Sequence, residues 1–304
     1  MEKFEVYILG CGSALPTTRH FSTSQVVNVR DKLYMIDCGE GAQLQFRKMH
    51  LKFSRLNHIF ISHLHGDHCF GLLGLISTLN LLGRTAELHI HSPRGLEQTI
   101  ASMLDFFCRQ MTYKVLFHEF DTSKAELIFE DRSLTVTTIP LCHRIPCSGF
   151  LFAEKPLPNH IVRSMTDFYG IPVFELNRIK NGADYVTADG TVVPNARLTT
   201  PATPPRSYAY CSDTAYKPDI VEQLKGVDLL FHEATFAQSD LPRAKETFHS
   251  TAHQAAQIAK DAEARHLLIG HFSARYDDEK VLLKEAAELF PHTTLAHEML
   301  CVQV

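Results

Sequence analysis

The stretch His63-Leu64-His65-Gly66-Asp67-His68 decides the fold and the chemistry expected of this chain. It places three imidazoles and one carboxylate directly after the apolar run 58–62. These groups are the usual ligands of a hydrolytic zinc ion, and the packing of a core does not require them. The period of two in a strand points His63 and His65 the same way, with Asp67 and His68 around the turn. A chance His-rich tract is the alternative, but the glycine-bearing turn favours a two-metal hydrolase centre.

A two-metal site needs further ligands, including a carboxylate that bridges the ions. Three candidates each follow a predicted strand, namely His143, Asp213 and His271. Strand ends are where α/β sheets place their sites, so these side chains can converge on the first motif. A single Asp or His at a strand end is a weak signal. Together with the motif, all three are predicted to be metal ligands.

Composition sets the broad class of the protein. The 304 residues are 45% apolar and 21% charged, which is typical of a globular protein with a sizeable core. The formal net charge of −4 means that any site for a polyanion must be local. The most apolar stretch, residues 70–83, is too short to span a bilayer and predicts a buried helix.

The expected location is the cytoplasm, without membrane association. The first residues show no basic segment followed by an apolar one, so we expect no secretory signal. The eight cysteines contain no C-x-x-C pair and are predicted to be reduced thiols. Cys69, Cys142 and Cys211 lie close to proposed ligands, and small buried filler is favoured over metal binding for them.

Short runs rich in Val, Ile and Phe alternate with helical segments, which predicts an α/β class with sheets covered by helices. The predicted strands are 6–9, 32–36, 87–90, 134–137, 208–211, 227–231 and 266–269. The predicted helices include 96–109 and 252–264, the second with Ser250 and Thr251 as N-cap candidates.

Residues 154–206 differ from the rest of the chain, because they are rich in proline and weak in periodicity. We expect them to form an arm that projects from a single domain spanning residues 1–304. Within it, residues 159–169 predict a short helix and residues 187–191 a hairpin turn. A disordered linker is the alternative, since long loops are usually functional or disordered.

The order of the motifs resembles that of the metallo-β-lactamase superfamily. The motifs are Asp37-Cys38-Gly39-Glu40-Gly41, then residues 63–68, His143, Ser212-Asp213-Thr214 and His271. Within the superfamily the chain is similar to the ribonuclease Z family of tRNA 3′-processing endoribonucleases. The narrower likeness is carried by Leu9-Gly10-Cys11-Gly12-Ser13 with Pro16 and Arg19, by residues 37–43, by His232-Glu233-Ala234-Thr235 and by His249-Ser250-Thr251.

The resemblance implies a four-layer αββα sandwich and two Zn²⁺ ions per subunit. One ion would be held by His63, His65 and His143, and the other by Asp67, His68 and His271. Asp213 would bridge them. Such ions lie roughly 3.5–4 Å apart, provide hydroxide at neutral pH and offset the charge that builds on a phosphate.

The resemblance also suggests catalytic roles. The family assigns the position of Asp67 as a proton acceptor, and the sequence does not separate this role from that of a ligand alone. His249 has the chemistry to donate a proton to the departing ribose oxygen, and Glu233 could orient it. For His249 the alternative is an ordinary loop residue ahead of a helix.

By this resemblance the expected function is that of a zinc-dependent endoribonuclease acting on precursor tRNA. Activated hydroxide would attack the phosphodiester and release the trailer, leaving a 3′-hydroxyl on the tRNA and a 5′-phosphate on the trailer. The family works as a homodimer in which one subunit's arm holds the RNA that the other cuts. The family's Gly-Pro element is missing here, and Gly170-Ile171-Pro172-Val173 stands near its place.

Two other functions remain open from the residues. One is a zinc phosphodiesterase or lactonase that acts on small molecules on the same fold, because fold does not fix substrate. The other is a non-catalytic RNA-binding protein that retains a structural metal site. Cleavage assays on precursor tRNA, a chromogenic phosphodiester and a lactone would discriminate between them.

Overall fold

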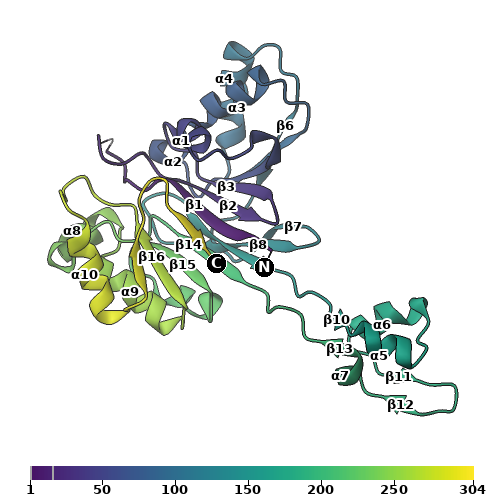
Figure 1. Cartoon of the computed structure of the whole chain (residues 1–304). Helices are drawn as coiled ribbons and strands as arrows, with labels where there is room; N and C mark the ends of the chain where they lie inside the picture. Colours follow the sequence, from purple (N-terminus) through teal and green to yellow (C-terminus); the bar gives the residue numbers. More distant parts are fainter. Residues whose placement is uncertain (1, 16) are drawn as a thin grey trace. The chain divides into compact units, whose positions relative to one another are not determined.

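The computed structural model describes residues 2–15 and 17–304, so Pro16 of the N-terminal motif lies outside the described residues. The chain divides into two compact units. The main unit comprises the residues up to 153 together with 206–304, and the inserted unit comprises residues 154–205. Figure 1 labels the elements of both units.

The main unit contains two seven-stranded sheets. The first sheet has the strand order β18 (Cys301–Gln303), β1 (Phe4–Gly10), β2 (Ser24–Val29), β3 (Lys32–Ile36), β4 (Leu56–Phe60), β5 (Leu88–Ser92) and β6 (Val115–Glu119). The second has the order β17 (Thr293–Leu295), β16 (His266–Gly270), β15 (Leu229–Glu233), β14 (Ser207–Cys211), β9 (Ser148–Glu154), β8 (Leu134–Pro140) and β7 (Leu127–Glu130).

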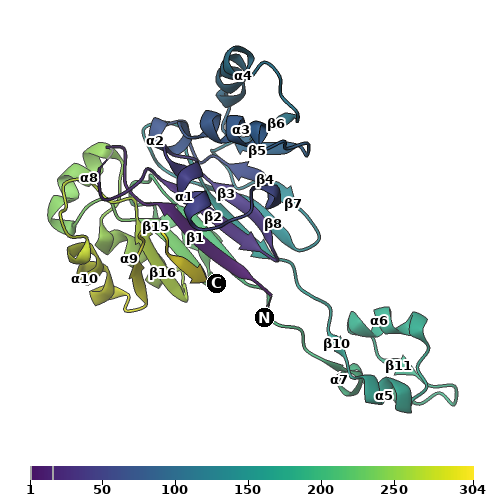
Figure 2. The ribbon, with the colours of Figure 1, turned by 45° about the horizontal axis from the view of Figure 1, so that its top comes forward.

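Helices lie beside both sheets of the main unit, as Figure 2 shows. The first sheet is accompanied by α1 (Ala42–Lys48), α2 (Gly66–Cys69), α3 (Leu72–Leu81) and α4 (Leu96–Phe107). The second is accompanied by α8 (Leu241–Thr247), α9 (Ala252–Asp261) and α10 (Lys280–Leu289). Together with the two sheets these helices make four layers, which confirms the predicted αββα class.

The alternation of side chains along the strands explains the layering. On β1, Phe4, Val6 and Ile8 belong to the core cluster that also contains Phe150 and Tyr210 of the second sheet. Leu9 belongs instead to a separate cluster, formed with the helices of the first sheet. Successive side chains of a strand point to opposite faces, so one strand supplies two cores.

The expected elements are found with small shifts at their ends. Every strand run predicted from the sequence overlaps a strand, and the helix expected over residues 70–83 is α3. The helix α9 begins as predicted, with Thr251 as its N-cap and a capping box formed with Gln254. Across the described residues, no helix combines the length and apolar character needed to cross a membrane. All eight cysteines are free.

The inserted unit is small and has its own core of Ile179, Val193 and Leu198. Its elements are β10 (His160–Ile161), α5 (Arg163–Phe168), α6 (Leu176–Lys180), β11 (Tyr185–Val186), β12 (Val192–Val193), α7 (Asn195–Leu198) and β13 (Thr199–Thr200). The pair β11 and β12 forms the hairpin expected around residues 187–191. The helix expected over 159–169 is limited to α5, because β10 occupies the residues before it.

Candidate metal centre

Elements of both sheets bring the seven predicted ligands together. His63 and His65 follow β4 of the first sheet, and Asp67 and His68 lie in the short helix α2. His143, Asp213 and His271 follow β8, β14 and β16 of the second sheet. The ligand atoms of these residues fall into two groups, in each of which all atoms lie within 4.8 Å of one another.

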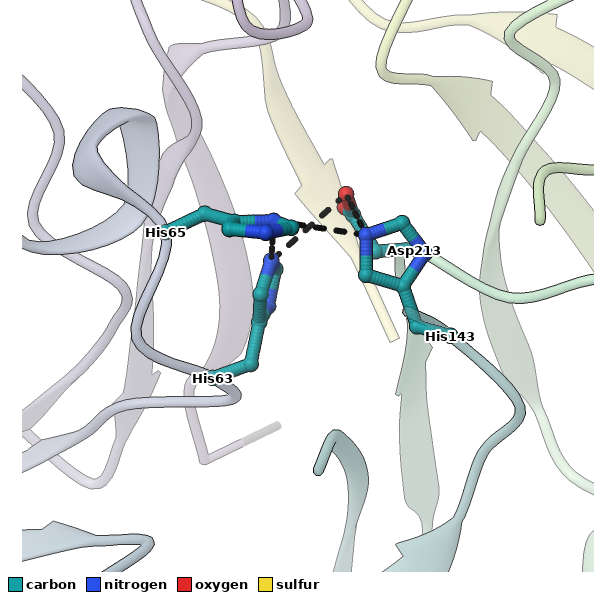
Figure 3. A group of neighbouring side chains, drawn as sticks. All are labelled: His63, His65, His143 and Asp213. Atoms are coloured by element: carbon teal, nitrogen blue, oxygen red, sulfur yellow. Dashed lines mark hydrogen bonds and ion pairs between the residues drawn. The ribbon is translucent and has the colours of Figure 1, made fainter. Parts of the chain in front are cut away.

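The first group consists of His63, His65, His143 and Asp213 (Figure 3). Nδ1 of His65 lies 3.0 Å from Nε2 of His63 and 3.3 Å from Nε2 of His143. Oδ2 of Asp213 lies 3.6 Å from Nε2 of His63 and 3.6 Å from Nε2 of His143. Three ring nitrogens and one carboxylate oxygen therefore face a common point.

The second group consists of Asp67, His68 and His271. Oδ2 of Asp67 lies 3.4 Å from Nε2 of His68 and 3.7 Å from Nε2 of His271. Oδ1 of Asp213 lies 3.2 Å and 3.1 Å from the same two nitrogens. Asp213 thus directs one oxygen toward each group, which is the arrangement that a bridging carboxylate requires.

The donor chemistry fits divalent metal ions. The Nε2 atoms of His68 and His271 are buried and have no hydrogen-bond partner among the described residues. Buried polar atoms without a partner are rare, because their desolvation is costly. Two ring nitrogens that both lack a proton, such as those of His63 and His65, repel each other. A cation between them removes this repulsion by accepting both lone pairs. Imidazole and carboxylate together suit zinc and related divalent ions.

The backbone is strained at two of the seven proposed ligands and at Asp37. Asp213 and His271 have φ values of 60°, and Asp37, which follows β3, has a φ of 55°. Positive φ is uncommon for residues other than glycine and costs about 1–3 kcal/mol each. Each of these residues directly follows a strand or lies within two residues of its end, where the chain must turn toward the centre.

Asp37 supports the second group, a role that the sequence analysis did not assign. Its Oδ2 lies 2.7 Å from Nδ1 of His68 and accepts a hydrogen bond from the hydroxyl of Tyr210, also at 2.7 Å. Ser62 donates its backbone N–H to Oδ1 and its hydroxyl to Oδ2. A carboxylate at one ring nitrogen fixes the tautomer and leaves the other nitrogen as a ligand. The sequence signals were the position of Asp37 at a strand end and its place at the start of the motif 37–41.

His249 and Glu233 form an ion pair beside the centre. Nδ1 of His249 lies 2.8 Å from Oε1 of Glu233, whose side chain is fully buried. Thr214 donates its backbone N–H to the same carboxylate at 2.7 Å. Burial alone would lower the pKa of His249, but the charge and hydrogen bond of Glu233 raise it to about 9. The pairing with Glu233 thus favours the protonated form of His249.

Burial and charge shift the pKa values of the central groups in opposite directions. Burial, followed by the charge of His68, lowers the pKa of His63 well below its ordinary value. Burial also opposes charge on His68, but the neighbouring carboxylates outweigh it and raise the pKa of His68 well above its ordinary value. Burial would raise the pKa of Asp213, yet the surrounding imidazoles hold it well below its usual range.

The centre opens into a cavity of about 770 Å³. Its lining includes His65, Asp67, His143, Asp213, His249 and His271. It also includes Arg144, Arg243 and Arg275. Guanidinium groups bind phosphate oxygens well. The cavity is therefore lined both by metal-type ligands and by basic side chains.

Comparison with known proteins supports this description. The model of the Anti-Pycsar protein Apyc1 family matches residues 4–157, and that of the beta-lactamase superfamily domain matches residues 196–272. Among solved structures, human tRNase Z, short form, has a TM-score of 0.71 and 26% identity and covers 98% of both chains. The fold and the site define this protein as a member of the metallo-β-lactamase superfamily.

Relatives narrow the assignment. The ribonuclease Z of Bacteroides fragilis strain YCH46 is 72% identical over 304 residues, which covers 100% of both chains. That of Porphyromonas gingivalis strain ATCC 33277 is 57% identical over 304 residues, again with 100% of both chains covered. The chain belongs to the ribonuclease Z family.

Proposed function

We propose that this protein is a zinc-dependent endoribonuclease that cleaves precursor tRNA at its 3′ end. The observation that carries the proposal is the meeting of seven metal-type ligands and the His249–Glu233 ion pair around one cavity. Full-length identity of 72% to a ribonuclease Z supports the same activity. The products would be a tRNA with a 3′-hydroxyl and a trailer with a 5′-phosphate.

Two Zn²⁺ ions per subunit are proposed, one in each ligand group. His63, His65 and His143 would hold the first ion, and Asp67, His68 and His271 the second. Asp213 would bridge them, because its two oxygens face different groups. When bound, such ions supply hydroxide at neutral pH and positive charge beside the phosphate.

Asp67 is proposed to accept a proton as well as to act as a ligand. Its side chain is 8% exposed, so it lies at the floor of the cavity within reach of water. The nearby imidazoles keep its pKa far below the usual range even though burial opposes this. The low pKa keeps this carboxylate ionised but makes it a weak base. The support for proton transfer is therefore its position, where it can accept the proton of a water that attacks the phosphorus atom.

His249 is proposed to donate a proton to the departing ribose oxygen. Its ring lies 5.1 Å from that of His143 and 5.4 Å from that of His271, measured between centroids. The side chain lines the cavity, and Glu233 keeps it charged and oriented. A positioned acid of this kind accelerates cleavage because the alkoxide need not leave with its full charge.

The RNA is proposed to contact both units, each through its own chemistry. In the main unit, Arg144, Arg243 and Arg275 line the cavity and can bind phosphates next to the cut. In the inserted unit, Phe168 and Phe174 are 77% and 78% exposed. Exposed aromatic rings suit the stacking of unpaired bases.

The basic side chains of the inserted unit are proposed to bind phosphates, which gives this arm-like segment the role of a tRNA-binding exosite. Arg163 and Arg178 pair with Asp167 and Glu175 within the unit, at 3.0 Å and 2.9 Å. Such exposed pairs are weak, so phosphate oxygens can replace the carboxylates. We further propose that the protein is a homodimer, because the family works with one subunit's arm holding the RNA that the other cuts. We also propose that it acts in the cytoplasm.

The proposal is tested by the cleavage of an end-labelled precursor tRNA, with product ends mapped before and after chelation. We expect one cut at the 3′ side of the acceptor stem, loss of cleavage on chelation, and recovery on addition of Zn²⁺. Hydrolysis of a chromogenic phosphodiester and of a lactone is measured in parallel. If these small molecules are hydrolysed much faster than the precursor, the alternative of a small-molecule phosphodiesterase or lactonase holds. RNA binding without any cleavage would instead indicate a non-catalytic protein.

A further inference from the structure

A third group of metal-type ligands lies in the main unit, outside the centre described above. It consists of Cys11, His20 and Glu298, whose ligand atoms all lie within 4.8 Å of one another. Sγ of Cys11 lies 3.3 Å from Nδ1 of His20, and this nitrogen lies 3.0 Å from Oε2 of Glu298. The other oxygen, Oε1, lies 3.8 Å from Sγ.

These separations are close to those of ligands on one small cation. Zinc bonds to sulfur and nitrogen at tetrahedral angles place ligand atoms about 3.3–3.6 Å apart. The group spans 3.0–3.8 Å, and the contacts between the proposed ligands of the catalytic centre span 3.0–3.7 Å. The chain thus brings sulfur, nitrogen and oxygen to one point, with the same spacing that it uses for its proposed catalytic ligands.

Glu279 supports this arrangement from behind His20. Its Oε1 lies 3.2 Å from Nε2 of His20, the nitrogen that faces away from Cys11. A carboxylate that accepts the proton of one ring nitrogen fixes the tautomer and leaves the other nitrogen as a ligand. This is the relation that Asp37 has to His68 in the first centre.

Burial and charge favour a divalent ion over water or a monovalent one. Cys11 is completely buried, and the side chains of His20 and Glu298 are 13% and 15% exposed. Burial raises the pKa of the Cys11 thiol, so the thiolate forms only when a metal displaces its proton. That thiolate and the carboxylate of Glu298 then carry two negative charges, which a divalent cation neutralises. Soft thiolate combined with imidazole selects zinc-like ions over magnesium or calcium. A proton on His20 is the competing occupant, because His20 lies between two carboxylates.

We propose that Cys11, His20 and Glu298 bind a divalent cation of the zinc type, separate from the ions of the catalytic centre. Binding releases two protons to solvent, that of the Cys11 thiol and that on Nδ1 of His20, and leaves Glu279 as the hydrogen-bond acceptor of Nε2 of His20.

The position of this site gives the ion a structural role. The carbonyl of Cys11 accepts a hydrogen bond from the backbone N–H of Phe272 at 3.0 Å, and Ser13 donates its N–H to the carbonyl of Phe272 at 3.1 Å. Phe272 directly follows His271, and Ser13 to Leu15 line the catalytic cavity. An ion at Cys11 therefore ties the first strand, the cavity wall and the C-terminal residues together.

Cobalt substitution tests the proposal through its sulfur ligand. The full chain is freed of metal, loaded with Co²⁺ alone and passed through a desalting column. Its absorption and its cobalt content per chain are then measured. We expect a near-ultraviolet thiolate-to-cobalt charge-transfer band, which the histidine and aspartate ligands of the catalytic centre cannot give. In Cys11→Ser the band disappears and the cobalt content falls by one ion per chain, while the visible bands of the other cobalt sites remain.

Two further variants guard against a folding effect. Glu298→Gln keeps the cysteine and should still lower the cobalt content by one ion, with circular dichroism checking the fold. Cys301→Ser replaces an exposed cysteine and should retain the band. The proposal is overturned if folded wild-type protein binds cobalt without a thiolate band, or if Cys11→Ser holds as much cobalt as the wild type. Nitrogen NMR of the zinc-loaded protein gives a further check. If both ring nitrogens of His20 are protonated, a proton and not a metal ion occupies this site.

Discussion

The main unit and the inserted unit differ in which side chains they bury. The main unit buries its polar groups, so that His63, His68 and Asp213 are at most 3% exposed and are held by charged neighbours. The inserted unit has only three residues in the buried core described for it, and it exposes large apolar side chains such as Phe168, Val173 and Phe174. Electrostatic interactions are stronger away from water, whereas binding of a large partner needs exposed groups. Chemistry is therefore expected from the main unit and RNA capture from the inserted unit.

The largest effect should follow from removing the bridging charge. Asp213→Asn keeps the size of the side chain but lowers the negative charge that faces both ligand groups. Turnover of precursor tRNA and of a small phosphodiester should fall together by at least about 10⁴-fold, equivalent to about 5.5 kcal/mol. Steady-state kinetics measure the loss of turnover, and mass spectrometry measures the metal content of the variant. Asp189→Asn, in the inserted unit, is the matched control and should keep hydrolysis of the small substrate.

Loss of the proton donor should have the next largest effect. His249→Ala should lower kcat for precursor tRNA by about 10²–10⁴-fold, because the ribose oxygen then departs without a proton. Metal content should not change, since this side chain is assigned to neither ion. His253→Ala replaces an exposed histidine of α9 and serves as the control. Loss of bound zinc in His249→Ala would refute the assigned role.

Weakening the support of a ligand should be milder. Asp37→Asn preserves the shape of the side chain but removes the charge that fixes the ring of His68. Metal affinity or activity should fall by about 10–100-fold, as for other residues behind metal ligands. Competition with a chromophoric chelator measures the affinity. An unchanged affinity would show that His68 is held by its other contacts alone.

Removal of the inserted unit tests the division of labour directly. Ala153 pairs with Ser207 across β9 and β14, so a short Gly-Ser turn can replace residues 155–205 without breaking the second sheet. Binding of precursor tRNA should weaken about tenfold or more, equivalent to about 1.4 kcal/mol. Hydrolysis of a small phosphodiester should persist. An equal loss of both activities would mean that the two units do not act separately.

The smallest effect concerns a stack of four histidines in the first sheet. His58, His89, His91 and His118 are cross-strand neighbours on β4, β5 and β6, and their rings stack. These side chains pack and hydrogen-bond with one another, for example His58 with His91 at 3.2 Å. Burial, followed by the neighbouring imidazoles, lowers the pKa of His91 to about 3 and that of His58 to about 4.

This stack predicts a pH dependence of stability. The folded protein keeps His91 neutral, whereas the unfolded chain takes up a proton near the ordinary value of about 6.5. The stability of the metal-free protein should therefore fall as the pH drops from about 6.5 toward 3, by at most about 1.4 kcal/mol per pH unit for this side chain. His91→Phe should flatten the dependence in urea unfolding at pH 7 and pH 5. Equal slopes in variant and wild type would contradict the prediction.

The seven proposed ligands show most clearly what local sequence determines. The motif at residues 63–68 and the strand ends at 143, 213 and 271 were enough to name seven side chains that the fold brings together. Local patterns achieved this, because strand periodicity and turn residues are properties of neighbouring positions. The capping box at Thr251 was visible for the same reason.

Other contacts had no local signal. Cys11 was expected only to be a reduced thiol like the other cysteines, yet it meets Glu298 across 287 positions of sequence. Thr235 belongs to a recognised motif, but nothing in the motif indicates that its hydroxyl lies 3.0 Å from Nδ1 of His271. Such pairings depend on how the strands are ordered within the two sheets.

The sequence by itself determined which chemical groups this protein has for metal binding, at which strand ends they occur, and to which family it belongs. The tertiary structure decided which atoms face one another: the two oxygens of Asp213 toward different ligand groups, and Asp37 behind His68. The physical reason is that side-chain type and strand period are encoded locally. The meeting of distant groups is set by the packing of two sheets, which many residues determine together.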